Sequence, residues 1–350
     1  MDINNINYKS SVTKALLPNL TENIFVVDVG ASKGYPRIWR SFPGKLTLHG
    51  FDPLIHEVER LNNAEKNPNI KYHAAYVLPV SVDKLSSIKE NTKRKDRVSA
   101  PGGSALGARL AAVKVKKMTG YNRIKEEFNS GQELAFANHG VSLDDFFRET
   151  GYEKIDFIKI DTDGHDYQVL TGAQKILCAQ QVLGLDVEVR FTGAQRDDAN
   201  LFRNVDKILG EAGFSLFHFE KKRYARSALP RPFLKNRPTV SDSGQIRWAN
   251  AVYLRDLGDP NHEAKLGGAY SLQKILKMIC LFDLYDLPDC AVEVVHKYRD
   301  IIASEVDPES ILNLLTPSIG DQKLTYREYM EQFNRAVEYK KYYEYGREII

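Results

Sequence analysis

The stretch from Ile24 to Gly34 constrains the fold more than any other part of the chain. Residues 24–29 read Ile-Phe-Val-Val-Asp-Val, and such a nearly continuous apolar run is typical of a strand buried on both faces of a parallel sheet. Gly30 and Gly34 follow, and glycine allows a sharp turn close to a ligand. We expect a helix to start within residues 35–41 with its amino end toward that ligand. The pattern predicts a ligand-binding turn after the first strand of an α/β domain.

The acid inside this stretch limits the kind of ligand. A dinucleotide fingerprint needs G-x-G-x-x-G, and no second glycine stands at that spacing after Gly30. The carboxylate of Asp28 would repel a pyrophosphate but suits a cationic ligand, such as the ammonium and sulfonium of S-adenosylmethionine (SAM). The next predicted strand, 46–51, is followed by Asp52-Pro53, and an acid there can hold ribose hydroxyls. The sequence favours SAM over NAD, with a purely structural turn and a surface acid as the alternative.

Three segments of the chain resemble the FkbM family of SAM-dependent methyltransferases. They read Val-Val-Asp-Val-Gly-Ala-Ser-Lys-Gly, then Gly-Phe-Asp-Pro, then Ile-Asp-Phe-Ile-Lys-Ile-Asp-Thr-Asp-Gly at 155–164, with Val-Leu-Thr-Gly-Ala at 169–173. One departure is Asp163, where the family more often has Glu. The resemblance covers residues 22–255 and implies a Rossmann-like class I methyltransferase that methylates a hydroxyl of a sugar or glycan, in a glycolipid, polysaccharide or nucleotide-linked precursor. With the spacing above, it places SAM on Asp28, Gly30, Ala31, Ser32, Gly34, Asp52, Pro53 and Asp161.

Apolar runs alternate with helical segments across residues 23–257. We predict a seven-stranded, mostly parallel sheet whose last strand runs antiparallel between the fifth and sixth, the usual order in methyltransferases. Residues 1–22 are predicted to form an arm or short helix over the sheet. Residues 258–350 are predicted to be a helical C-terminal region that packs on the core or provides a docking or dimer surface. The expected strands are 24–29, 46–51, 70–77, 155–160, 182–189, 214–219 and 246–254, and the longer helices are 54–66, 165–178 and 198–212.

Two basic segments interrupt this pattern. The insertion 80–140 carries twelve Lys or Arg against two acids between Lys84 and Lys125. It is either a solvated surface excursion or a lid that meets an anionic acceptor. A second basic segment, 221–237, is predicted to connect the sixth and seventh strands at the edge where ligands bind in open α/β sheets. The substrate-binding candidates are Ser104, Arg223, Arg226 and Arg231.

The end of the fourth strand carries the candidates for chemistry. A period of two places Lys159 and Asp161 on one face, and a lysine in an apolar strand needs a partner, either Asp161 or a ligand. A sugar hydroxyl needs a general base or a metal to react at neutral pH. We favour a metal-independent reaction over a divalent ion on Asp161, Asp163 and Glu188. A lysine–aspartate pair that only fixes the turn, and a surface histidine, are the structural alternatives. The catalytic candidates are Lys159, Asp161, Asp163, His165 and Glu188.

Charge and cysteine content exclude several functional classes. The net charge is only +3 over 350 residues, which implies no nucleic-acid-type field. Three cysteines without metal spacing indicate reduced thiols and a cytoplasmic location. The polar N-terminus and the lack of a long apolar run argue against secretion and membrane spanning. The alternatives are a methyltransferase acting on nucleic acid or another small molecule, or a catalytically silent SAM-binding or ligand-binding module.

Overall fold

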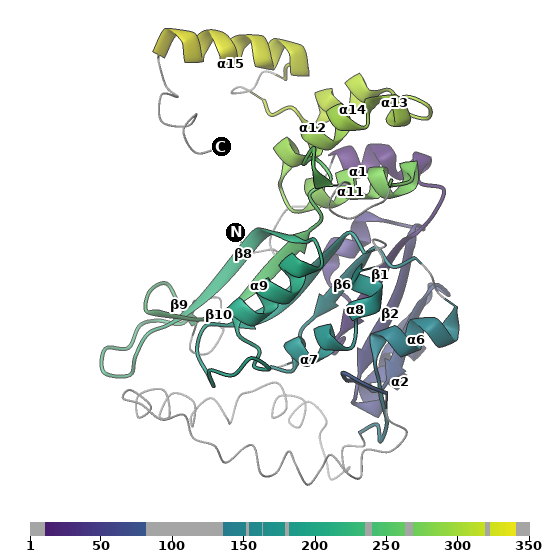
Figure 1. Cartoon of the computed structure of the whole chain (residues 1–350), viewed down its shortest axis with the longest axis vertical. Helices are drawn as coiled ribbons and strands as arrows, with labels where there is room; N and C mark the ends of the chain where they lie inside the picture. The colour runs from purple at the N-terminus through teal and green to yellow at the C-terminus, as the bar shows by residue number, and fades with distance from the viewer. Residues whose placement is uncertain are drawn as a thin grey trace. The chain divides into compact units, whose positions relative to one another are not determined.

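The computed structural model describes residues 11–81, 136–151, 154–162, 164–178, 182–234, 240–262, 269–318 and 323–340 (Figure 1). These residues belong to two compact units. Among the described residues, the first comprises Ile24–Pro36 and Leu46–Arg255, and the second comprises residues 11–23, Arg37–Lys45 and those from Asp256 onward. Most of the basic insertion, including Ser104, lies outside the described residues, as do Asp163, Lys235 and Arg237.

A mostly parallel sheet forms the centre of the first unit, in the order β3-β2-β1-β6-β7-β10-β8-β9. The first five strands pair in parallel, and β10 runs antiparallel between β7 and β8. The predicted class and the antiparallel insertion of the last long strand are confirmed. The strand count of seven is one too low, because the short β9 adds an edge strand. The strands are β1 (Ile24–Val29), β2 (Leu46–Asp52), β3 (Ile70–Ala74), β6 (Phe157–Ile160), β7 (Gly184–Arg190), β8 (Ser215–Tyr224), β9 (Val240–Ser241) and β10 (Gln245–Leu254).

Two further strands stand apart from this sheet. The predicted strand 70–77 ends at Ala74, and β4 (Tyr76–Val77) pairs in parallel with β5 (Gly140–Val141) in a small sheet of its own. Sequence alone shows one apolar run here, because the change of partner depends on residues far along the chain.

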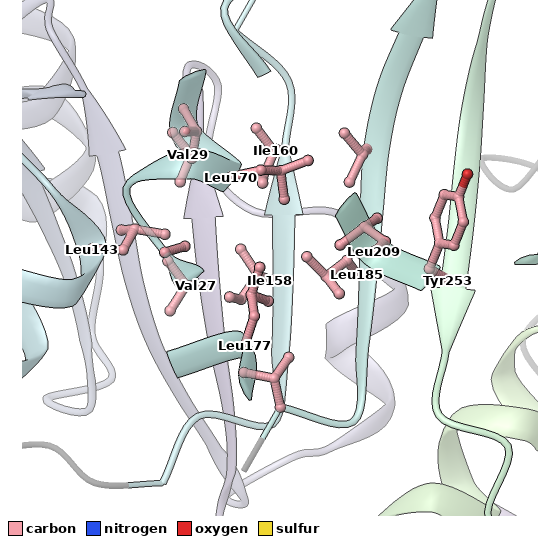
Figure 2. Packing of buried hydrophobic residues seen from close by; sticks show 14 of the residues in the cluster. Val27, Val29, Leu143, Ile158, Ile160, Leu170, Leu177, Leu185, Leu209 and Tyr253 are labelled. Carbon is pink, nitrogen blue, oxygen red and sulfur yellow. The ribbon is translucent and has the colours of Figure 1, made fainter. Parts of the chain in front are cut away.

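The main core fills one face of the sheet. Val27, Val29, Ile158, Ile160 and Leu185 point to this face, as Figure 2 shows. Helices cover it with apolar side chains of their own, and each such side chain contributes about 1.5–3 kcal/mol when fully buried. The covering helices are α6 (Leu143–Thr150), α7 (Asp166–Thr171), α8 (Gln174–Cys178) and α9 (Phe202–Glu211).

The helix α6 has a side-chain cap at its start and a glycine at its end. The side chain of Ser142 accepts a hydrogen bond from the Asp145 N–H, and Gly151 ends the helix with a φ of 70°. Two negative side chains in the first turn complement the helix dipole. The helix α2 (Ile55–Ala64) also lies within its predicted range.

Two predicted helices differ in the structure. In place of a helix at 35–41 there is a 3-10 helix, η2 (Arg37–Ser41), because Pro36 disfavours helical backbone at Tyr35 and Pro43-Gly44 stops the helix soon after. The predicted helix 165–178 is split into α7 and α8 at Gly172. A Cβ on Gly172 would overlap the carbonyl oxygen of Leu78, so this close approach of two backbones fixes the break.

The second basic segment is also different from its prediction. Lys221, Lys222 and Arg223 belong to β8 and not to a connection, because β8 keeps pairing with β10 as far as Tyr224. Lys222 is buried, forms an ion pair with Glu220 and lies 5.8 Å from the centroid of the Trp248 ring. The connection itself starts after Tyr224. Because β8 runs parallel to β7, this connection leaves the sheet at the carboxyl edge, as predicted.

The second unit is helical in its described part. Residues 1–22 were predicted to lie over the sheet; here the N-terminal helix α1 (Ser11–Leu16) belongs to the second unit and packs on α11 (Leu272–Leu284) and α14 (Pro308–Leu315). Thr13 Oγ1 donates a hydrogen bond to Asp283 Oδ2 over 2.8 Å and so fastens that helix to α11. None of the described helices combines the length and apolar character needed to cross a membrane. The elements are α1 (Ser11–Leu16), η1 (Leu17–Asn19), α11 (Leu272–Leu284), α12 (Pro288–Lys297), α13 (Arg299–Ile302), α14 (Pro308–Leu315) and α15 (Tyr326–Lys340).

Candidate active site

The turn after β1 and the end of β6 lie against each other. Gly30 has a φ of +86°, and a Cβ there would overlap the carbonyl oxygen of Asp161. The N–H groups of Gly30 and Ala31 both donate to the carbonyl oxygen of Phe51, over 2.9 and 3.0 Å. The Gly34 N–H closes the turn on the Ala31 carbonyl at 3.0 Å. The carboxyl ends of β1, β2 and β6 therefore meet at one place, which is where ligands bind in open α/β sheets.

Lys159 stands between two carboxylates at this place. Its Nζ lies 3.0 Å from Asp28 Oδ1 and 3.6 Å from Asp161 Oδ2. The predicted partner Asp161 is therefore present, but Asp28 is the nearer one, because β1 and β6 place Asp28 directly beside Lys159. Desolvation opposes the charge of Lys159, yet the negative charges of Asp28 and Asp161 outweigh it and raise the lysine pKa above its usual value.

The two carboxylates differ in exposure. The Asp28 side chain is 1% exposed, whereas that of Asp161 is 42% exposed. Asp28 Oδ2 is buried without a hydrogen-bond partner among the described residues. Asp28 can thus accept a further hydrogen bond at Oδ2, and the carboxylate of Asp161 is accessible to a molecule from solvent.

Two acids, one at the end of β2 and one on α2, accept backbone hydrogen bonds near the glycine turn. Asp52, 8% exposed, accepts a hydrogen bond from the Leu54 N–H at 2.9 Å. Burial raises the pKa of Asp52, although hydrogen bonds from the backbone of Leu54 and Ser32 act in the opposite direction. Glu57 accepts a hydrogen bond from the Lys33 N–H at 2.8 Å. Sequence reasoning missed Glu57, for which the only signal was an acid in the first turn of the helix after the second strand.

A buried acid organises the turn after β6. Asp166 Oδ1 accepts hydrogen bonds from the N–H and the hydroxyl of Thr162, over 2.8 and 3.1 Å, and Asp166 Oδ2 accepts one from Asn200 at 2.6 Å. Burial raises the pKa of Asp166 to about 6. His165 is exposed at the N-cap position of α7, which agrees with its placement just beyond the strand. Sequence reasoning missed Asp166, because one of its partners, Asn200, comes from a distant segment.

Glu188 lies on the strand next to Asp161, as predicted. Strands β6 and β7 pair in parallel with Lys159 beside Asp186. Two residues further along each chain, the same register brings Glu188 beside Asp161. Asp186 was missed. Burial raises its pKa to about 7, although the charge of Lys159 lowers it. No group of three metal-ligating side chains occurs in the part of the chain that the structure describes. A metal on Asp161, Asp163 and Glu188 stays an untested alternative, since Asp163 is not described.

Two of the three arginines among the substrate candidates have partners within the protein. Arg231 Nε lies 3.0 Å from Asp242 Oδ1, and Arg223 Nη1 lies 3.5 Å from the carbonyl oxygen of Gly244. Arg226 is exposed. Their role in binding substrate is not tested by this arrangement.

A comparison with protein families identifies the chain. Residues 28–216, more than half of the sequence, match the family model described as the methyltransferase FkbM domain. The chain belongs to the FkbM methyltransferase family. This confirms the predicted family. The matched residues include Asp28, Asp52, Lys159 and Asp161.

Solved structures show more distant similarity to this FkbM chain. One is the methyltransferase FkbM from Methylobacillus flagellatus KT, with 13% identity, a TM-score of 0.35, and coverage of 66% of this chain and 43% of that one. A second is the magnesium protoporphyrin IX methyltransferase ChlM from Synechocystis PCC 6803 with bound SAM, with 11% identity, a TM-score of 0.30, and coverage of 70% and 79%. The chain thus spans less than half the length of the Methylobacillus protein. No curated protein matches. The assignment rests on the family match, because TM-scores this low carry no argument.

Proposed function

We propose that this FkbM-family chain transfers the methyl group of SAM to a hydroxyl of a sugar or glycan, within a glycolipid, polysaccharide or nucleotide-linked precursor. The observation that supports this proposal best is the position of Asp161. Its carboxylate is 42% exposed, and its backbone lies against the Gly30 turn. An acceptor hydroxyl at this edge of the sheet would find a carboxylate next to the cofactor turn.

The residues at this edge fit SAM. Asp28 keeps a buried oxygen without a partner among the described residues, which suits a cationic ligand. The proposed cofactor residues are Asp28, Gly30, Ala31, Ser32, Gly34, Asp52, Pro53 and Asp161. When bound, SAM supplies an electrophilic methyl group on its sulfonium.

The side chains of the protein orient the acceptor. We assign Asp161 to accept a hydrogen bond from the reacting hydroxyl, with the ammonium of Lys159 holding the carboxylate at 3.6 Å. Holding the hydroxyl in line can supply much of the rate enhancement. Asp166 fixes the turn in which Asp161 sits through its hydrogen bonds with Thr162. His165 and Glu188 are the alternative bases, and Asp163 remains a candidate from sequence.

The acceptor is proposed to be anionic. Arg223, Arg226 and Arg231 lie at or beyond the carboxyl end of β8, on the same edge as Asp161. Their guanidinium groups suit phosphate or carboxylate. We place the reaction in the cytoplasm, which the free cysteines support.

The proposal is tested in two stages. Calorimetry should show that the purified chain binds SAM or S-adenosylhomocysteine and not NAD. Transfer of a labelled methyl group is then measured with paired neutral and phosphorylated sugars. We expect turnover of the phosphorylated members, and decreasing turnover as salt screens the arginines. SAM binding with methylation of only non-sugar acceptors would overturn the glycan assignment but not the family. Equal, salt-insensitive turnover of neutral sugars would overturn the anionic acceptor.

A further inference from the structure

The described part of the connection between β8 and β9 carries large apolar side chains that are exposed to solvent. Leu229 is 79% exposed, Phe233 58% and Leu234 43%. Leu229 is the most exposed large hydrophobic residue in the described part of the chain. Three such side chains within six residues form an apolar surface that is unusual for a stretch in water, where single exposed apolar side chains are the norm. We refer to residues 226–234 as the β8–β9 tip.

Positive charge surrounds these apolar side chains. Arg226 and Arg231 are both exposed and alternate with them. Residues 220–234 and 240–247 carry six Lys or Arg against two acids. Both acids already form ion pairs, Glu220 with Lys222 and Asp242 with Arg231. The second pair is exposed on both sides, 46% and 60%, and such surface pairs are weak enough to exchange for another anion.

The backbone of the tip suits contact with an apolar layer. Pro230 and Pro232 have no N–H group, so two donors that would be costly to bury are absent. The base of the tip is well fixed, since the Ala225 N–H donates to Ser241 Oγ at 2.9 Å and Trp248 Nε1 donates to the Tyr224 hydroxyl at 2.9 Å. The described part of the tip contains no α-helix or β-strand. Its apolar side chains therefore form no regular face of the kind that fits a protein groove.

We propose that the β8–β9 tip docks on the surface of an anionic lipid bilayer. Leu229, Phe233 and Leu234 would enter the boundary between headgroups and acyl chains, while Arg226 and Arg231 contact lipid phosphates. Amphipathic surface elements with basic and large apolar side chains bind membranes in this way. The tip leaves the sheet at the same edge as Asp161, so docking would bring that edge toward lipid-linked acceptors. Docking does not depend on the proposed acceptor, because it is measured without turnover.

The test is flotation of the full chain with vesicles of phosphatidylcholine alone or with roughly 30 mol% phosphatidylglycerol. We expect binding only to the anionic vesicles, weaker at higher salt. The variants Leu229→Ser/Phe233→Ser and Arg226→Gln/Arg231→Gln should each reduce the partition coefficient roughly tenfold or more. The matched control is Leu216→Ser, which removes an apolar side chain that is 39% exposed on β8, and it should bind as the wild type does.

Three outcomes would overturn docking. They are absence of binding to anionic vesicles, equal binding by the apolar double variant, and full competition by free glycerol phosphate, which would indicate a soluble phosphate ligand instead. Light scattering covers the remaining alternative. A wild-type dimer that the apolar variant converts to monomer, with no vesicle binding by either, would assign the tip to contact between two copies. Vesicle binding without methyl transfer would contradict the proposed function but not docking. Methyl transfer without vesicle binding would contradict docking but not the proposed function.

Discussion

Lys159 donates a hydrogen bond to Asp28 across strands β1 and β6, with its Nζ 3.0 Å from Asp28 Oδ1. Both residues stand in the same cross-strand register, so the contact joins the two strands whose ends form the candidate site. Asp28 is buried, and among the described residues Lys159 is the cation that pairs with it. The same ion pair therefore stabilises the centre of the sheet and fixes the positions of the two strand ends that form the site.

Removing the lysine should show this coupling. Lys159→Met leaves the Asp28 carboxylate buried without a cation, and breaking a buried pair from one side costs about 3–5 kcal/mol. We expect a loss of that order in the free energy of unfolding, measured by urea denaturation. The double variant Asp28→Asn/Lys159→Met should recover part of the loss. If the single variant is as stable as the wild type, the pair does not support the fold.

Asp52 is expected to contribute to cofactor affinity. A hydrogen bond to a charged group is worth about 1.5–3 kcal/mol, so Asp52→Ala should weaken SAM binding roughly tenfold or more in calorimetry. Asp300→Ala, an exposed acid on α13, is the control. Because Asp52 also accepts the Leu54 N–H, thermal unfolding of the same variant must be measured beside it. Unchanged SAM affinity in a folded variant would contradict the ribose assignment.

Asp161 is expected to act in the chemical step. Asp161→Asn keeps the shape and removes the charge, so it should still bind SAM but lose most of kcat, as for an interaction made mainly in the transition state. Near wild-type kcat would move the chemistry elsewhere in the site.

The same assay separates a protein base from a metal. In the metal-independent version that we favour, a chelator has no effect and His165→Ala lowers the rate by about 10²–10⁴-fold. In the other version a chelator abolishes activity, Mg²⁺ or Mn²⁺ restores it, and Glu188→Gln weakens that rescue. Inhibition by chelator with metal rescue would therefore contradict our choice.

A buried histidine, His49, and a half-buried one, His73, should make the protein sensitive to acid. His49 Nδ1 and His73 Nε2 lie 2.9 Å apart, and burial lowers the pKa of each to about 4. An unfolded histidine has a pKa of about 6.5, so the unfolded chain binds more protons between these values. The free energy of unfolding should therefore fall as the pH is lowered through this window.

Thermal unfolding measured across that window checks this expectation. Asp166 and Asp186 have raised pKa values, so their protonation stabilises the folded state as the pH falls and opposes the effect of the histidines. The wild type must therefore be compared with a variant that keeps both aspartates. His73→Phe should show a smaller decrease in Tm on acidification than the wild type. His56→Gln, at a half-exposed histidine on α2, is the control. An unchanged pH dependence in His73→Phe would exclude the pair as the cause.

Much of the sheet was predictable because its strands are rich in apolar residues. Residues 24–29, 46–51 and 182–189 could be assigned from this local pattern, and the resemblance supplied the strand order. The break at Gly172 could not be predicted, since it depends on contact with Leu78, which lies far away in sequence. The same holds for Arg255, which is fully buried and donates to the carbonyl oxygens of Val182 and Ala212.

The candidate site was predictable in its residues more than in its contacts. Asp28, Lys159 and Asp161 were all selected, but the nearer partner of Lys159 follows from the register of β1 against β6, which no local pattern reveals. Asp166, Asp186 and Glu57 escaped notice for a related reason. Each is an ordinary acid in sequence, and only tertiary contacts bury it or give it backbone donors.

The insertion of β10 between β7 and β8 has a consequence for synthesis on the ribosome. Strands β7 and β8 leave the exit tunnel before β10, so each has an open edge facing the place that β10 will later fill. Exposed strand edges are templates for pairing with other chains, and domains generally fold as units during synthesis. The first unit therefore cannot be completed until residue 254 has emerged. A nascent chain stopped before that point is expected to be the most aggregation-prone form of this protein.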